Sequence, residues 1–167
     1  HIRIKRIGDI FVSLLIILLA SPIILIVSLL IYLEDKGPIF YSQIRTGLNG
    51  EIIKIIKFRS MHVDAEIEGI QWSKNNDKRI TSIGKIIRAV RIDELPQLFC
   101  VLTGSMSLIG PRPERPEIEK KLFKEVPYYN SRYVLKPGIS GWAQVNYPYG
   151  ASISDTKIKL SYDIYYI

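Results

Sequence analysis

A long run of apolar residues lies near the start of the chain. Residues 10–33 read IFVSLLIILLASPIILIVSLLIYL without a charge, and Glu34, Asp35 and Lys36 follow directly. A straight helix of this length would be ~36 Å long, enough to cross a hydrocarbon core of ~30 Å. The pattern therefore predicts a membrane helix over residues 1–36, with residues 37–167 forming one further domain.

Ser21 and Pro22 interrupt this run at its middle. Proline cannot donate a helical hydrogen bond and its ring presses on the carbonyl of Leu18, so we expect a bend that the serine hydroxyl helps to satisfy. Each arm would be ~18 Å long, too short to cross but long enough to enter one leaflet and return. Because proline kinks also occur in true spans, these residues leave a spanning helix and a re-entrant helix open.

The flanking charges bear on this choice. Arg3, Lys5 and Arg6 precede the apolar run, and basic flanks favour the cytoplasmic side of a membrane. A spanning helix would then put the following domain outside the cell, whereas a re-entrant helix keeps both ends on the cytoplasmic side.

Beyond residue 36 the pattern changes to short segments. Two β-rich runs flank Asn49-Gly50, which predicts a β-hairpin. Residues 81–91 predict a basic amphipathic helix capped by Thr81 or Ser82, with apolar positions at Ile83, Ile86, Ile87 and Val90. Such a helix lies either on anionic lipid head groups or on an ordinary protein surface.

The remaining segments complete a helix-rich α+β class. Residues 93–104, 116–126 and 154–167 have helical spacing, and residues 64–80 read as a helix start followed by a loop. Trp72 in that loop is either an interfacial anchor or a partly buried packing residue. The expected architecture is a membrane helix and one small domain with a short hairpin and amphipathic surface helices.

Composition narrows the class of partner. The chain carries 23 Lys+Arg against 16 Asp+Glu, a net charge of +7, which favours anionic partners. The single Cys100 cannot form an internal disulfide, which fits a reducing, cytoplasmic location. There is no zinc-ligand spacing and no phosphate-cradling glycine loop, and the aromatic residues do not interleave with basic ones as single-strand nucleic-acid binding requires.

Two adjacent acids, Asp93 and Glu94, are the candidate chemistry in this basic chain. Pro96 permits a helix start here, and the positive end of a helix dipole would lower both pKa values. Neighbouring helical residues point roughly 100° apart, so the two should have different tasks. One carboxylate could attack phosphorus while the other holds Mg²⁺; the alternative is a helix N-cap and an ordinary first-turn acid.

Basic residues near the pair could clamp phosphate oxygens. Arg112 lies between Pro111 and Pro113, so little conformational freedom remains for it to lose on bidentate phosphate binding. Lys57 and Arg59 form a second basic cluster, for which a solvated strand face is the alternative.

Five blocks in order carry a family resemblance: KFRSM (57–61), RIDELPQL (91–98), SLIGPRPE (107–114), KPGISGWAQVN (136–146) and YDIYYI (162–167). With the Ser-Pro inside the apolar run, they resemble the bacterial sugar transferases called monotopic phosphoglycosyl transferases. NYPYGAS (146–152) is similar to the large, exopolysaccharide-initiating type, also called polyprenyl glycosylphosphotransferases, whose extra N-terminal region and C-terminal tail would be missing here.

The resemblance implies transfer of a sugar 1-phosphate from a UDP-sugar to undecaprenyl phosphate, with release of UMP, at the cytoplasmic face of the bacterial inner membrane. It implies Asp93 as nucleophile, Glu94 as the Mg²⁺ ligand, and Arg88 and Arg112 as phosphate-binding groups, with Lys57 and Arg59 as further substrate-binding candidates. It also implies that the helix broken at Ser21-Pro22 is re-entrant and contacts inner-leaflet phospholipids.

Two alternatives stay open at this point. One is a non-catalytic membrane adaptor that binds anionic lipids, and the other is a transferase that joins donor and acceptor directly, in which the acids only bind metal. A homo-oligomer is compatible with each of them.

Overall fold

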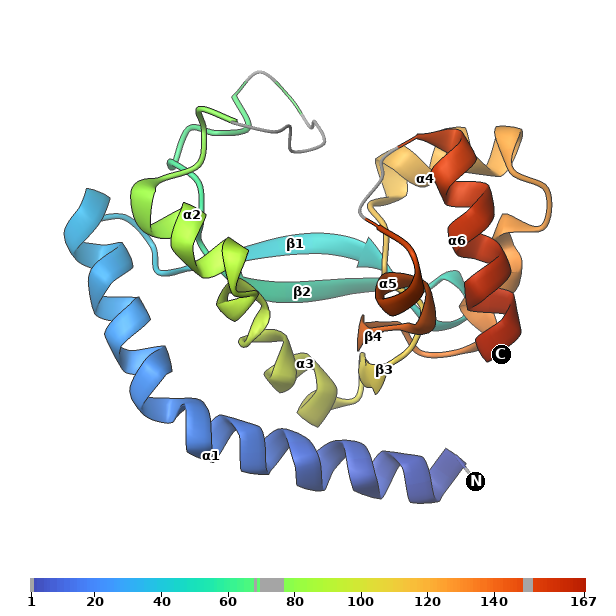
Figure 1. Cartoon of the computed structure of the whole chain (residues 1–167), viewed down its shortest axis with the longest axis horizontal. Helices are drawn as coiled ribbons and strands as arrows, with labels where there is room; N and C mark the ends of the chain where they lie inside the picture. Colours follow the sequence, from blue (N-terminus) through green and yellow to red (C-terminus); the bar gives the residue numbers. More distant parts are fainter. Residues whose placement is uncertain (1, 68, 70–76, 149–151) are drawn as a thin grey trace.

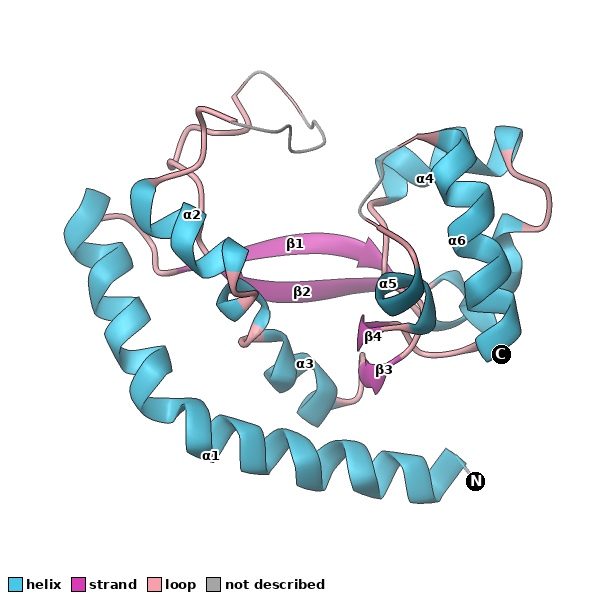
Figure 2. Ribbon diagram, viewed as in Figure 1, coloured by secondary structure: helices cyan, strands magenta, loops and turns pink. Residues whose placement is uncertain are grey.

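The computed structural model describes residues 2–67, 69, 77–148 and 152–167. Within them the chain forms six α-helices, two small sheets and three short 3₁₀ turns. Helices and strands follow in the order α1 (Ile2–Asp35), β1 (Phe40–Thr46), β2 (Ile52–Phe58), α2 (Ser82–Ala89), α3 (Gln97–Thr103), β3 (Ser107–Ile109), α4 (Pro116–Glu125), β4 (Gly138–Ser140), α5 (Trp142–Asn146) and α6 (Ile153–Tyr166). The 3₁₀ turns are η1 (Leu48–Gly50), η2 (Ile92–Glu94) and η3 (Tyr129–Val134). The predicted helix-rich α+β class is confirmed (Figure 2).

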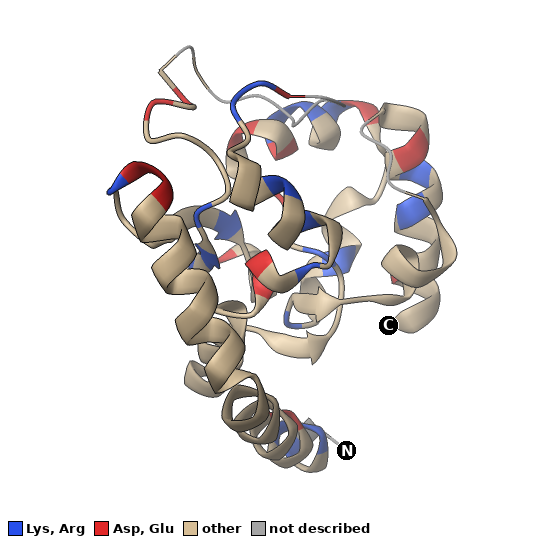
Figure 3. Ribbon diagram, turned by 60° about the vertical axis from the view of Figure 1, so that its left-hand side comes forward, with Lys and Arg blue, Asp and Glu red and all other residues tan. Residues whose placement is uncertain are grey.

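Helix α1 contains Pro22 inside it and bends near its middle (Figure 1). The Ser21 hydroxyl donates to the Leu18 carbonyl oxygen at 2.8 Å, so the expected compensation for the missing proline donor is present. The helix is long and apolar enough to cross a membrane, judged by length and composition. Figure 3 shows that its charged residues lie at its two ends.

Both arms of α1 pack on the rest of the chain. In the second arm Val27 and Ile31 form one core cluster with Phe58 of β2 and Ile87 of α2. At the other end, the Ser107 hydroxyl donates to the Asp9 carboxylate at 2.8 Å, and the side chain of Arg6 donates to the carbonyls of residues 101 and 102 in α3. The outward side of the helix keeps large apolar side chains exposed, including Phe11, Leu18, Leu19, Leu25 and Leu29.

Strands β1 and β2 form the predicted antiparallel hairpin, paired from Phe40↔Phe58 to Thr46↔Ile52. The connection contains Asn49 at φ 55° and Gly50 at φ 79°, a left-handed conformation that these two residue types adopt at low cost. The predicted strands and the predicted turn between them are therefore both confirmed.

Helix α2 is amphipathic as predicted, and the Thr81 hydroxyl caps it by accepting a hydrogen bond from the Gly84 amide at 2.9 Å. Fewer of its apolar residues are buried than the spacing of the apolar positions predicted. Ile87 is buried, whereas Ile86 and Val90 are 63% and 60% exposed. The helix packs on α1 along one side only, which leaves these two side chains outside the core.

The C-terminal part of the chain forms a second packed region on the far side of the hairpin (Figure 1). Here β3 pairs in parallel with β4, and the core cluster of α4, η3 and α6 consists of Leu122, Val126, Tyr129 and Leu160. The helix predicted over residues 116–126 is present as α4, and Ile118 also packs against this cluster.

Candidate active site

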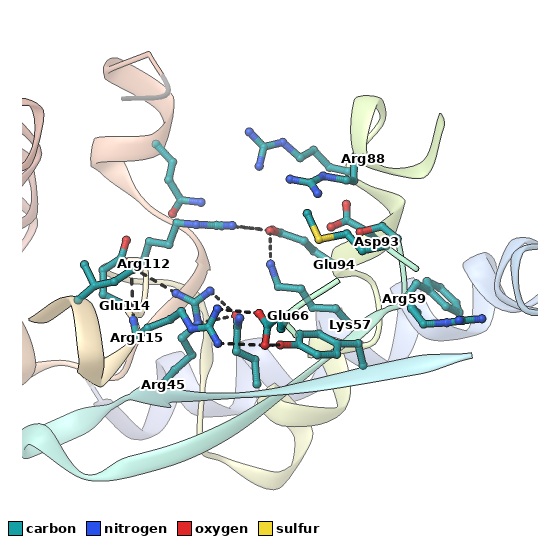
Figure 4. Close-up of a pocket in the computed structure, with 18 of the residues that line it drawn as sticks. Arg45, Lys57, Arg59, Glu66, Arg88, Asp93, Glu94, Arg112, Glu114 and Arg115 are labelled. Carbon is teal, nitrogen blue, oxygen red and sulfur yellow. Dashed lines mark hydrogen bonds and ion pairs between the residues drawn. The ribbon is translucent and has the colours of Figure 1, made fainter. Parts of the chain in front are cut away.

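A cavity of about 770 Å³ lies between the hairpin, the α2–η2 segment and the C-terminal region. Asp93, Glu94, Arg88, Arg112 and Lys57 all line it. Four separate stretches of sequence therefore bring these five predicted site residues to one place (Figure 4).

The acid pair sits in the 3₁₀ turn η2, which follows Arg91 in the left-handed conformation at φ 61°. Both carboxylates are buried, with 8% of Asp93 and 7% of Glu94 exposed. The expectation that the pair opens the following helix is wrong in detail, because Pro96 is the N-cap residue of α3 and the acids precede it. As expected, the two side chains point in different directions (Figure 4).

Glu94 is held by two cations. Lys57 donates to its Oε1 at 2.9 Å, and Arg112 contacts both carboxylate oxygens, at 2.5 and 3.3 Å. Burial alone would raise the pKa of Glu94, but the hydrogen bond and charge of Arg112, together with Lys57, lower it to about 2. For the cation Lys57 burial has the opposite effect and lowers the pKa.

Asp93 has a different environment. Its Oδ1 is buried and has no hydrogen-bond partner in the described part of the chain. Burial raises the pKa of this carboxyl, the charge of Lys57 opposes that shift and the charge of Glu94 adds to it. The expectation of a lowered pKa is therefore wrong for Asp93, because loss of hydration outweighs the neighbouring positive charges, among them Arg88 and Arg112.

Two other arginines hold the Pro-Arg-Pro turn that carries Arg112 in place. Arg132 donates to the backbone carbonyl of Arg112 at 2.7 Å and pairs with Asp163 of α6 at 2.9 Å. From β1, Arg45 donates to the carbonyl of Pro113 at 3.0 Å. The stiffness expected from two prolines is thus reinforced by the buried Arg132 and the partly buried Arg45.

Arg59 lines the cavity but is engaged elsewhere. Its guanidinium forms an ion pair with Asp35 at the end of α1, at 2.9 Å. Ser21 and Pro22 lie within α1 and do not line the cavity. Of the predicted basic groups, then, Lys57 and Arg112 bind Glu94 directly, Arg88 faces Asp93, and Arg59 pairs with the end of α1.

Sequence reasoning missed a group at the other end of the cavity. Arg115 pairs with Glu66 at 2.9 Å, and the Tyr41 hydroxyl donates to the same carboxylate at 3.0 Å. These residues stand singly in segments without a phosphate-binding pattern, so only the alternation of β1, which sends Tyr41, Gln43 and Arg45 to one face, hinted at them.

The site fits a magnesium ion of the kind held partly by substrate. Among the described residues there is no cluster of three or more His, Cys, Asp or Glu that could bind a metal. Mg²⁺, however, is commonly bound by one or two carboxylates plus substrate phosphates and water. Glu94 stays ionised, and the neighbouring Asp93 has a buried oxygen without a partner in the described chain, so this donor set suits that mode.

Two sequence expectations fall on residues that are not described. Trp72 is one, and the central residues 149–151 of NYPYGAS are the other.

Comparisons with known proteins agree with the motifs. The family model described as bacterial sugar transferase matches residues 1–167. A UDP-N-acetylgalactosamine-undecaprenyl-phosphate N-acetylgalactosaminephosphotransferase of Aeromonas hydrophila is 48% identical over 98% of this chain and 39% of its own length. A UDP-glucose:undecaprenyl-phosphate glucose-1-phosphate transferase of Klebsiella pneumoniae is 40% identical over 98% of this chain and 36% of its own length.

A shorter relative also matches. The exopolysaccharide production protein PSS of Rhizobium leguminosarum bv. phaseoli is 41% identical over 98% of this chain and 84% of its own length. The chain thus spans less than half of the first two relatives and most of the third. With a family model matched from end to end and the motif residues gathered in one cavity, this chain belongs to the bacterial sugar transferase family.

Proposed function

We propose that this chain transfers a sugar 1-phosphate from a UDP-sugar to undecaprenyl phosphate, releases UMP, and so begins the assembly of an exopolysaccharide or another glycoconjugate. The names of the Aeromonas and Klebsiella relatives support the class of donor and acceptor. The observation that carries the proposal is the buried oxygen of Asp93, unpartnered within the described residues, beside a carboxylate bound by Lys57 and Arg112.

In the first half of the reaction Asp93 acts as the nucleophile. One carboxylate oxygen forms a bond to the phosphorus that carries the sugar, the bond from that phosphorus to the bridging oxygen breaks, and UMP leaves with that oxygen. The product is a phosphosugar joined to Asp93 as an acyl phosphate. Burial favours this role, because a poorly hydrated carboxylate loses little solvation when it attacks.

The cations around the pair stabilise the charge of the transferring group. Arg112 presents a planar fork on a rigid turn, and Lys57 contributes a point charge. A Mg²⁺ ion bound by Glu94 would neutralise charge that builds on the leaving phosphate.

In the second half an oxygen of undecaprenyl phosphate attacks the same phosphorus. The bond to Asp93 breaks, the carboxylate is regenerated and the polyprenyl-diphospho-sugar is released. Arg88, in the last turn of α2 and facing Asp93, is the group we assign to the acceptor phosphate.

We further propose that α1 is re-entrant and that the domain lies on the cytoplasmic face of the inner membrane. Two observations support this. Arg6 near the start of the helix contacts α3, and Asp35 at its end contacts Arg59 of the same domain. A helix that crossed the bilayer would place these two ends on opposite sides, whereas a bent helix in one leaflet leaves both at the surface.

The deciding experiment uses Asp93→Asn in nanodiscs that contain undecaprenyl phosphate. We expect UMP release from UDP-sugars to fall at least about a hundredfold, since the amide is a far weaker nucleophile. With wild-type chain and no acceptor, mass spectrometry should find the phosphosugar on Asp93. Asp64→Asn, at an exposed position, is the matched control and should keep wild-type rates.

Other outcomes separate the alternatives. A transferase that joins donor and acceptor directly would release no UMP without acceptor and would carry no label on Asp93. An adaptor would bind anionic vesicles equally well as wild type and as the Asp93→Asn variant, and it would never release UMP.

A further inference from the structure

Helix α1 ends in two acids, Glu34 and Asp35, and has no basic residue in its last turn. The C-terminal end of a helix carries partial negative charge, so acids there are unfavourable unless groups outside the helix stabilise them. Both acids have such partners: those of Glu34 are in α2, which carries Arg88, and that of Asp35 directly follows β2, which carries Lys57.

Glu34 binds the start of α2. Its carboxylate accepts hydrogen bonds from the backbone amides of Ser82 at 2.7 Å and Ile83 at 3.2 Å. The first amides of a helix have no partner within it, and the Thr81 hydroxyl takes the next one, that of Gly84. A side chain of the membrane helix therefore completes the cap of α2.

This contact matters because α2 has only eight residues. Isolated helices of that length are not stable in water, so contacts with other elements set the orientation of α2. Glu34 holds the N-terminus of α2, and Ile87 packs in the cluster that contains Val27 and Ile31 of α1. Phe58 of β2 belongs to the same cluster, so α1 and β2 together position the helix. Arg88 follows Ile87 directly, so its position depends on how α2 is held by α1.

Asp35 binds the end of β2 in a parallel way. Its carboxylate pairs with both terminal nitrogens of Arg59, at 2.9 and 2.5 Å, and Arg59 is only 6% exposed. Lys57, two residues earlier, pairs with Glu94. The last two residues of α1 thus attach this helix at two separate places. Glu34 binds α2, which carries Arg88, and Asp35 binds the end of β2, which carries Lys57.

We propose that Glu34 is a positioning residue for the acceptor half of the reaction: by capping α2 from the membrane helix, it holds Arg88 at the depth where a lipid phosphate arrives. This inference rests on the proposed function. The hydrogen bonds of Glu34 go to the start of α2 and not to the acids or to Arg112, so the donor half of the reaction should not depend on it.

The test compares Glu34→Ala with wild type in nanodiscs and measures the two half-reactions separately. Loss of two charge-assisted hydrogen bonds should raise the KM for undecaprenyl phosphate about tenfold, equivalent to about 1.4 kcal/mol. The rate at which Asp93 acquires the phosphosugar without acceptor should stay within about twofold of wild type. Glu34→Gln retains an oxygen that can accept from the Ser82 amide and should recover part of the loss.

A control variant tests whether the effect is specific to Glu34. Glu51→Ala removes an exposed acid from the hairpin connection and should change neither half-reaction. Amide hydrogen exchange at Ser82 and Ile83 should accelerate in Glu34→Ala and not in Glu51→Ala. An unchanged acceptor KM, or an equal fall in both half-reactions, would overturn the proposal. If wild type never labels Asp93, the proposed function itself fails.

Discussion

Ser21 donates its hydroxyl hydrogen to the carbonyl oxygen of Leu18 at 2.8 Å, the carbonyl that Pro22 leaves without an amide partner. The bend in α1 is therefore stabilised locally, without an unsatisfied backbone group in an apolar environment. The sequence itself therefore encodes the bend. The pair also offers a direct test of the proposal that α1 is re-entrant.

Replacing Ser21 and Pro22 together by alanine should straighten α1, because residue 22 regains the amide that the Leu18 carbonyl needs. The uncharged run of ~36 Å would then be able to span. The basic flank favours a cytoplasmic N-terminus, so a spanning helix would move the following domain to the outside. A cysteine at the exposed position 145 (Val145→Cys) in a Cys100→Ser background reports the side of that domain by labelling with an impermeant maleimide. We expect external labelling only in the straightened variant.

The same Val145→Cys chain with Ser21 and Pro22 intact is the control, and it should label only after the membrane is opened. External labelling of that control would show that the native helix spans.

Gly84→Ala should destabilise the domain. A Cβ at this position would lie 2.0 Å from the Ser60 carbonyl oxygen, so α2 would have to move away from the chain that follows β2. Overpacking of this kind costs about 1 to 3 kcal/mol, measurable by urea unfolding in detergent. Gly8→Ala is the matched control: in the described part of the chain, no atom beyond its chain neighbours and its own helix backbone would lie within 4 Å of the added Cβ. Alanine there should stabilise the helix by up to about 1 kcal/mol. Equal unfolding midpoints for the two variants would contradict the close approach.

Glu119→Gln should stabilise the chain at high pH. Glu119 is 2% exposed, and its Oε1 has no hydrogen-bond partner among the described residues. Burial raises its pKa above the ordinary 4.5, although the Thr46 hydroxyl donates to it. Stability from its protonated form is thus fully present below pH 4.5 and is lost as pH rises through the folded pKa.

Because glutamine resembles the protonated form, the variant should exceed wild type by about 1 to 3 kcal/mol at about pH 8 and match it near about pH 4. Urea unfolding at the two pH values measures this. Glu117→Gln, whose side chain is 52% exposed, should show no such difference. A variant less stable than wild type at the higher pH would mean that the folded chain needs the charge of Glu119.

Much of the fold follows from local pattern. The apolar run, the Asn49-Gly50 turn and the spacing of residues 116–126 each determine one element, because the periodicity lies within a few residues. The exposure of Ile86 and Val90 does not follow from local pattern, since it depends on how much of α2 the helix α1 covers.

The sequence predicted which residues line the cavity better than it predicted which of them contact one another. Family motifs identify Asp93, Glu94 and Arg112, but the pairing of Glu94 with Lys57 requires β2 and η2 to meet. Likewise the raised pKa of Asp93 is a consequence of burial that the charge of its neighbours in sequence does not reveal. Arg59 shows the same limit, because its partner Asp35 lies at the end of α1, far away in the sequence.

The polar contacts of α1 also have a consequence for synthesis on the ribosome. Arg6 binds a carbonyl 95 residues later in the chain, and Asp9 binds Ser107. At about 5 to 20 residues per second, these partners are made about 5 to 20 s after Arg6 and Asp9. The charged start of α1 is therefore without these partners until α3 and β3 have been made, so the first arm of the helix can pack on the rest of the chain only late in synthesis.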